Sequence, residues 1–170
     1  VSQSGSRFLT LTPDQTGISV VNRYDDPRMW DERYETFAFG SIGTGVAIGD
    51  YDNDGRPDVF VVRKTETNRL FRNLGDWKFE DVTERAGVAG PADAWQQGAA
   101  FVDINNDGNL DIYVARFDAP NLLLVNNGHG TFSERAREAG LDLPHATTMG
   151  AWADYDRDGW LDVYAQTNVL

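Results

Sequence analysis

The sequence predicts an all-β protein built from β-propeller blades, each a sheet of four antiparallel strands, and predicts that the chain supplies only part of such a propeller. Three observations support this prediction: an internal repeat, short strand-like runs within each repeat, and an Asp-rich loop at the same place in every repeat. Apolar residues make up 41% of the chain and aromatic residues 12%, which is enough for a packed core.

The repeat is visible when the sequence is shifted against itself by 53 residues. Residues 45–87 then fall on residues 98–140 without a gap, and a third copy begins at Gly150 and stops at Leu170, where its second strand should end. We therefore expect one repeat-built domain over residues 1–170. Its expected parts are an N-terminal strand and insertion (1–44), repeat 1 (45–97), repeat 2 (98–149) and a partial repeat 3 (150–170).

Each full repeat contains four runs that are rich in β-branched and aromatic residues and bounded by Gly, Asn and Asp, as is typical of strands. In repeat 1 the expected strands are 45–49, 59–62, 68–73 and 79–83. Turn residues at 73–76 and 126–129 predict hairpins, and residues 84–87 and 134–140 predict short helical turns that end at glycine.

Small residues recur in the first strand of every repeat. They are Gly45, Ala47, Gly98, Ala100, Gly150 and Ala151. The innermost strands of a propeller crowd around its central axis, so this strand is expected to lie there.

The first two strands of each repeat are joined by an acidic loop, at residues 50–58 (loop 1), 103–111 (loop 2) and 154–162 (loop 3). Each loop carries an oxygen-bearing side chain at positions 1, 3, 5 and 9 and glycine at position 6. Calcium takes about six to eight hard oxygen ligands, and a tight loop with this alternation can wrap them around one ion. The backbone carbonyl at position 7 would add one more oxygen.

The sequence thus predicts three calcium sites with a structural role. The expected side-chain ligands are Asp50, Asp52, Asp54 and Asp58; Asp103, Asn105, Asp107 and Asp111; and Asp154, Asp156, Asp158 and Asp162. The expected carbonyl ligands are those of Arg56, Asn109 and Trp160.

The loops differ from an EF-hand, which needs a Glu at position 12 and a helix on each side. Position 12 here is Val61, Val114 or Ala165, each inside a strand-like run. One such loop alone is equally well explained as a polar turn, but three copies favour calcium. Magnesium is disfavoured because it prefers a shell that keeps several waters.

The acidic loops and their flanking strands resemble the FG-GAP/VCBS-type repeats of integrin-α-like β-propellers. Residues 39–43, Phe-Gly-Ser-Ile-Gly, are similar to the name-giving motif without its Ala-Pro. Residues 68–73 and 79–88, with Asn-Arg-Leu-Phe-Arg-Asn and Phe-Glu-Asp-Val-Thr-Glu-Arg-Ala-Gly-Val, look like the repeat unit of bacterial proteins similar to cartilage acidic protein. Residues 8–18 resemble the opening segment of the same family, with one extra residue before Gly17.

The resemblance implies a calcium-bound propeller that is exported, whether extracellular, on the cell surface or periplasmic, and that serves adhesion, protein interaction or complex assembly. It implies a module that is not an enzyme. A propeller has about 4–8 blades, whereas 170 residues at 53 per blade supply about three. The expected partner is therefore another protein or the remaining blades, with carbohydrate as a further option.

Charge and composition exclude other classes. The net charge of −12 argues against binding to nucleic acid or an anionic membrane, because both need a basic face. The chain has no run of about eighteen apolar residues, so no membrane insertion is expected. It has no cysteine, which excludes disulfides and Cys nucleophiles.

Two alternatives stay open: a non-catalytic part of a polysaccharide-active lyase or hydrolase, and a carbohydrate-binding module. His129 and His145 lie in no catalytic motif, and a Gly-x-Ser-x-Gly elbow is absent from the sequence. A convergent His/Tyr/Arg or carboxylate set in one cleft would favour an enzyme.

The unrepeated insertion 18–44 is the expected place for specific binding, since long insertions in repeat proteins often lie on a binding face. The candidate binding residues there are Arg28, Trp30, Arg33 and Tyr34. The remaining tryptophans, Trp77, Trp95, Trp152 and Trp160, are expected to pack on or between blades.

Overall fold

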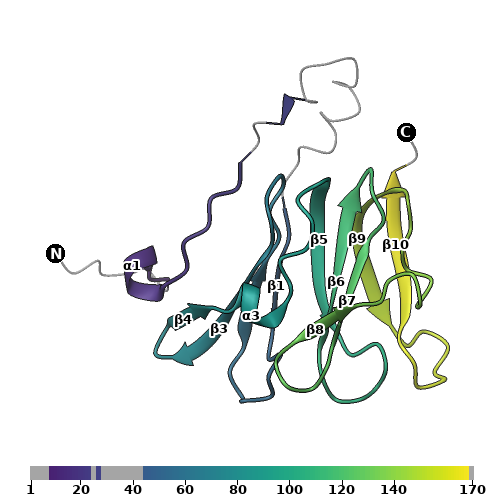
Figure 1. Ribbon diagram of the computed structural model, residues 1–170. Helices are drawn as coiled ribbons and strands as arrows, with labels where there is room; N and C mark the ends of the chain where they lie inside the picture. The colour runs from purple at the N-terminus through teal and green to yellow at the C-terminus, as the bar shows by residue number, and fades with distance from the viewer. Residues whose placement is uncertain (1–7, 24–25, 28–43, 169–170) are drawn as a thin grey trace.

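The computed structural model describes residues 8–23, 26–27 and 44–168 (Figure 1). These residues form two four-stranded antiparallel sheets and one two-stranded antiparallel sheet, with little helix. The predicted all-β class and the predicted four-stranded sheets are confirmed. The candidate binding residues Arg28, Trp30, Arg33 and Tyr34 lie outside the described residues. Among the described residues, no helix has the length and apolar character needed to cross a membrane.

The sheets follow the chain in order, each strand pairing with the next. The first sheet contains β1 (Val46–Gly49), β2 (Asp58–Val61), β3 (Arg69–Gly75) and β4 (Lys78–Asp81). The second contains β5 (Trp95–Val102), β6 (Asp111–Phe117), β7 (Leu122–Asn126) and β8 (Phe132–Glu134), and the third contains β9 (Ala146–Ala153) and β10 (Asp162–Asn168). The strand limits lie within about two residues of those expected for repeat 1, the normal uncertainty of strand ends.

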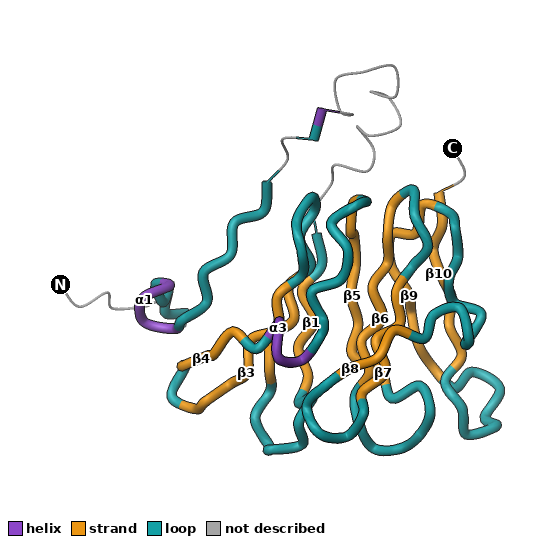
Figure 2. The backbone as a smooth tube through the Cα atoms, in the orientation of Figure 1, coloured by secondary structure: helices purple, strands orange, loops and turns teal. Residues whose placement is uncertain are grey.

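The three sheets stand side by side like neighbouring blades, with their acidic loops along one edge (Figures 1 and 2). Their first strands approach closely because they carry glycine where they meet. A side-chain carbon at Gly45 would lie 2.7 Å from the Ala99 nitrogen, and one at Gly98 would lie 2.6 Å from the Thr148 oxygen. The crowding expected at the small residues is therefore confirmed for Gly45 and Gly98, whereas their place around a central axis stays a prediction.

The core lies between neighbouring sheets, and the same aromatic contact recurs at both interfaces. Phe60 of β2 meets Phe101 of β5, with ring centroids 6.5 Å apart. One repeat later, Tyr113 of β6 meets Trp152 of β9 at 5.2 Å, again nearly edge to face. An aromatic side chain from the first strand of each later sheet thus packs on the second strand of the sheet before it.

In the described part of the chain, two short helices accompany the sheets. The helix α3 (Thr83–Ala86) follows β4 and ends at Gly87, whose φ of 74° is the left-handed cap that glycine favours. This confirms the first expected helical turn. The second is a single turn over residues 136–140, in which the Ala139 nitrogen donates to the Arg135 carbonyl at 3.1 Å and the turn ends at Gly140 with a φ of 69°. The helix α1 (Pro13–Thr16) lies near β4 (Figure 1).

The tryptophan prediction is half wrong. Trp95 is buried and contacts Phe117, and Trp152 packs on Tyr113. Trp77 and Trp160, however, are 71% and 55% exposed. Trp77 lies in the turn between β3 and β4 of the first sheet, and Trp160 lies in the acidic loop of the last sheet. Among the described residues, the first sheet has no sheet before it and the last sheet has none after it.

Candidate metal centre

Strand pairing puts the two ends of each acidic loop side by side. Position 9 is the first residue of the second strand, and it pairs with the residue just before position 1: Gly49 with Asp58, Val102 with Asp111, and Ala153 with Asp162. The acids at positions 1 and 9 are thereby neighbours in all three sheets.

The acid at position 1 organises the turn of the loop. In loop 1, Asp50 accepts hydrogen bonds from the backbone nitrogens of Asp54 at 3.1 Å and Gly55 at 2.8 Å. The equivalent bonds in loops 2 and 3 measure between 2.9 and 3.1 Å. Such bonds satisfy backbone donors that a tight loop would otherwise leave unpaired.

The acid at position 9 is held by the strands. Asp58 accepts from the nitrogens of Tyr51 at 3.1 Å and Asn73 at 2.7 Å, and Asp111 accepts equivalent bonds of the same lengths. Both side chains are fully buried. In loop 3, Asp162 accepts from the Tyr155 nitrogen at 3.0 Å.

Backbone conformation explains two further loop positions. Position 6 is Gly55, Gly108 or Gly159, with φ between 83° and 91°. Position 4 also has a left-handed backbone, with φ of 56° at Asn53 and 54° at Asn106. Asparagine tolerates this region better than most residues do, and glycine adopts it freely. Arg157 occupies the same position in loop 3 with a φ of 66°.

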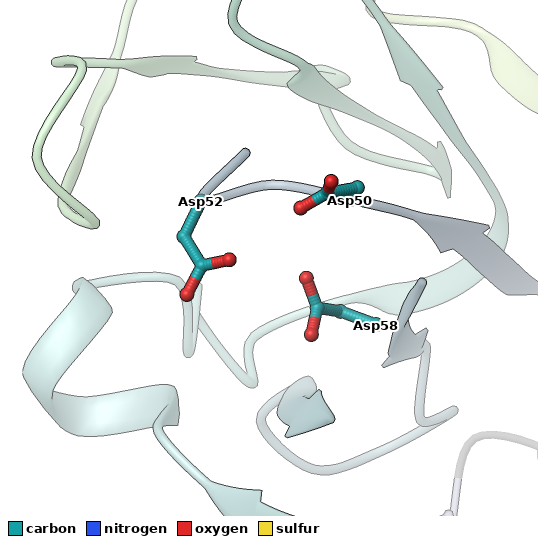
Figure 3. A group of neighbouring side chains, drawn as sticks. All are labelled: Asp50, Asp52 and Asp58. Carbon is teal, nitrogen blue, oxygen red and sulfur yellow. The ribbon is translucent and has the colours of Figure 1, made fainter. Parts of the chain in front are cut away.

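The loops bring acidic oxygens together. In loop 1, one oxygen each from Asp50, Asp52 and Asp58 lies within 4.8 Å of the others, and Figure 3 shows the three side chains facing a common space. Asp154, Asp156 and Asp162 form the same group in loop 3. Loop 2 has Asn105 at position 3, and its amide oxygen accepts a hydrogen bond from the Asp107 nitrogen at 3.1 Å, as Asp156 does from the Asp158 nitrogen in loop 3.

The donor set fits a hard divalent cation. Among the described residues, Asp52 Oδ1 is buried and has no hydrogen-bond partner, a state that is costly for a carboxylate oxygen unless a cation faces it. Burial, together with the charges of Asp52 and Asp54, raises the pKa of Asp58 to about 6 despite two backbone hydrogen bonds that lower it. A bound cation would offset this repulsion.

Loop 1 also contacts two arginines. Arg72 of β3 places Nε 2.6 Å from Asp52 Oδ2, an ion pair without hydrogen-bond alignment, and Nη2 3.0 Å from Asp54 Oδ2. Arg56 also binds Asp54. Sequence reasoning assigned Arg56 only a carbonyl role and missed Arg72, which reaches the loop through strand pairing.

A groove of about 400 Å³ lies beside loop 1, lined partly by Tyr51, Arg72, Glu80, Arg85 and His129. Most of these charged groups serve internal contacts, as with Arg85, which binds Glu80 at 3.1 Å. Burial raises the pKa of Tyr51 above its ordinary value. That shift moves the hydroxyl away from the range a general base needs.

Comparison with known sequences now gives the family. The sequence pattern of the FG-GAP-like repeat matches the chain twice, over residues 50–114 and 103–165, so that each match begins at position 1 of an acidic loop. The chain belongs to the FG-GAP-like repeat family. Each FG-GAP match starts in the acidic loop of one sheet and ends in the second strand of the next sheet, at residue 114 in β6 and residue 165 in β10. The length of the match therefore agrees with the spacing of the sheets.

Three curated relatives match part of the chain. Cartilage acidic protein 1 of Mus musculus is 33% identical over 126 residues, covering 73% of this chain and 19% of that protein. The Homo sapiens protein is 35% identical over 125 residues, covering 73% and 18%, and the Xenopus tropicalis protein is 37% identical over 68 residues, covering 39% and 10%. The chain thus spans less than a fifth of the length of these curated relatives.

The predicted FG-GAP resemblance and the likeness to cartilage acidic protein are confirmed. These relatives are vertebrate proteins. The bacterial part of the resemblance therefore stays a prediction, as does the division of the chain at residues 44, 97 and 149.

Proposed function

We propose that the chain is a calcium-stabilised, extracytoplasmic β-propeller module for adhesion, protein interaction or complex assembly. The observation that supports it best is the same hydrogen bonding of the position 1 and position 9 acids in all three loops, together with the buried, unpartnered Asp52 Oδ1 in loop 1. The proposed ligands are the oxygens named above at positions 1, 3, 5, 7 and 9 of each loop.

The proposed role of the ion follows from where the loop lies. Position 1 follows the first strand of a sheet and position 9 begins the second, so one ion would join the two strands. The three loops hold eleven carboxylates, whose mutual repulsion the ions would offset. The metal would supply structural stability, with no catalytic step.

Partner binding is supported by the outer faces of the first and last sheets. Ile48 is 69% exposed, although its equivalent in the second sheet, Phe101, packs on Phe60. Tyr164 is 77% exposed, although its equivalent, Tyr113, packs on Trp152. Inside the molecule, a side chain on the first strand of one sheet packs on a side chain of the second strand of the sheet before it. Among the described residues, Ile48 is the first-strand half of this contact without its partner, and Tyr164 is the second-strand half without its partner. We propose that further blades or a protein partner cover both faces.

Family membership supports a place outside the cytoplasm and a role without catalysis. The groove beside loop 1 is the one observation that favours the second candidate, a polysaccharide-active protein, because it gathers Tyr, Arg and His side chains. Its arginines are engaged with acids, which favours the first candidate. Binding of a polysaccharide by the purified chain would support the second.

Thermal unfolding tests the calcium role. We expect the melting temperature of the chain to rise strongly from excess chelator to millimolar calcium, because an ion that binds only the folded state stabilises it by mass action. Magnesium at the same concentration should give a smaller rise. Equal melting temperatures in chelator and in calcium would contradict the proposal.

A further inference from the structure

Loops 1 and 2 are each hydrogen-bonded to the loop of the next sheet through their position 4 side chain. Asn53 Nδ2 of loop 1 donates to the Gly108 carbonyl of loop 2 at 3.3 Å and to Asn109 Oδ1 at 3.1 Å. Asn106 Nδ2 of loop 2 donates to the Gly159 carbonyl of loop 3 at 2.6 Å. The contact thus occurs at both loop-to-loop junctions and in one direction.

The carbonyl that accepts this hydrogen bond belongs to a peptide unit whose nitrogen is hydrogen-bonded within its own loop. The nitrogen of Asn109, on the far side of the Gly108 peptide, donates to Asp107 Oδ1 at 2.8 Å. In loop 3 the nitrogen of Trp160 donates to Asp158 Oδ1 at the same distance. The peptide between positions 6 and 7 is therefore fixed at its oxygen by the neighbouring loop and at its nitrogen by the position 5 acid.

This peptide lies directly before the position 7 carbonyl and is bonded to the position 5 carboxylate, both of which are proposed ligands. The position 4 asparagine that reaches it stands between the position 3 and position 5 ligands of its own loop. An ion that orders residues 3 to 5 of one loop would thereby also order the position 4 asparagine, whose side chain is hydrogen-bonded to the next loop.

We propose that Asn53 and Asn106 couple the three loops energetically, so that a cation bound in one loop raises the affinity of the next. This inference rests on the proposed calcium function. Coupling of this kind is reciprocal, so occupation of loop 2 also strengthens binding in loop 1. Asn53 and Asn106 are positioning residues: they touch the neighbouring loop and not the ion.

Loop 3 supplies a matched control. Arg157 stands at position 4 with the same left-handed backbone, but no further acidic loop follows it among the described residues. Changing each position 4 residue to glycine keeps the backbone conformation favourable and removes the side chain. Asn53→Gly and Asn106→Gly then remove a loop-to-loop bond, whereas Arg157→Gly removes none of those described here.

The test is a calcium titration of the full chain followed by the backbone amide resonances of Gly55, Gly108 and Gly159, which report on each loop separately. Coupling between sites is typically about 5–150-fold in affinity. We expect Asn53→Gly to raise the calcium midpoints of loops 1 and 2 by about 5-fold or more. Asn106→Gly should do the same for loops 2 and 3, and Arg157→Gly should leave loops 1 and 2 unchanged.

A second readout needs no calcium. In chelator, Asn53→Gly should speed hydrogen exchange at the Asn109 amide, and Asn106→Gly should speed it at the Trp160 amide. Calcium binding with unchanged midpoints in both asparagine variants would overturn the coupling and leave the proposed function intact. A wild-type chain that binds no calcium would overturn both.

Discussion

Lys64 is a fully buried cation that the acidic loops do not explain. Its Nζ donates to Gln97 Oε1 at 2.9 Å and lies 5.1 Å from the centre of the Trp95 ring. Burial lowers the pKa of Lys64 to about 8. The side chain is therefore partly neutral in the folded protein at a pH where it would be charged in the unfolded chain.

This shift predicts a pH dependence. An unfolded lysine keeps its proton up to a pH of about 10.4, whereas folded Lys64 begins to lose it near pH 8. Between these values the unfolded state binds more protons, so the free energy of unfolding should rise with pH. Urea unfolding between pH 8 and pH 10 would measure the slope. The Lys64→Met variant should lack this rise, and an equal slope in both proteins would contradict the assignment.

The residues of the loops were largely predictable because their chemistry is local. The spacing of Asp50, Asp52 and Asp58 is enough to predict that their side chains gather, and the structure brings them together. Arg72 was not predictable, because it belongs to another strand and meets Asp52 only through pairing in the sheet. The contact of Asn53 with loop 2 likewise depends on how two sheets stand beside each other.

The first strand of each sheet depends on glycine where it meets its neighbour. A side-chain carbon at Gly98 would lie 2.6 Å from the Thr148 oxygen, well inside contact distance and against backbone that cannot rotate away. We expect Gly98→Ala to push β5 and β9 apart and to lower the free energy of unfolding by about 1–3 kcal/mol.

Chemical denaturation of the two proteins measures this loss. Ser133→Ala on β8 is a suitable control, because its hydroxyl donates a surface hydrogen bond to Asn127 Oδ1 at 3.2 Å and lies in no sheet-to-sheet contact described above, so the change should stay within about 0.5 kcal/mol. A Gly98→Ala protein as stable as the wild type would show that the first strands do not need their close approach.

Strands were predicted well and short helices less well. Alternating apolar residues bounded by Gly and Asp mark a strand wherever it lies, so β1 to β4 appear where expected. Residues 136–140 make the second expected helical turn, although it is too short to count as a helix. The helix α1 was not predicted, although Pro13 at its first position and Gln15 Oε1, which accepts from the Thr12 nitrogen at 2.8 Å, are starting signals.

At the scale of the whole molecule, the internal repeat predicted the number and order of the sheets. What it did not predict is the exposure of individual side chains on the outer sheets, because that depends on neighbouring sheets and not on the pattern within a repeat. Trp77 and Trp160 illustrate this limit: each lies on an outer sheet and is exposed. Ile48 and Tyr164 are exposed for the same reason, because each lies on a sheet face with no neighbouring sheet among the described residues.

Three equivalent loops also imply one property of the entire chain, its capacity for calcium. Equilibrium binding to protein first stripped with chelator counts the ions directly. We expect three calcium ions per chain, one for each loop, with Asp103→Asn and Asp154→Asn each lowering the count by one. A chain that binds no calcium at millimolar concentration, while its sheets stay folded, would contradict the account.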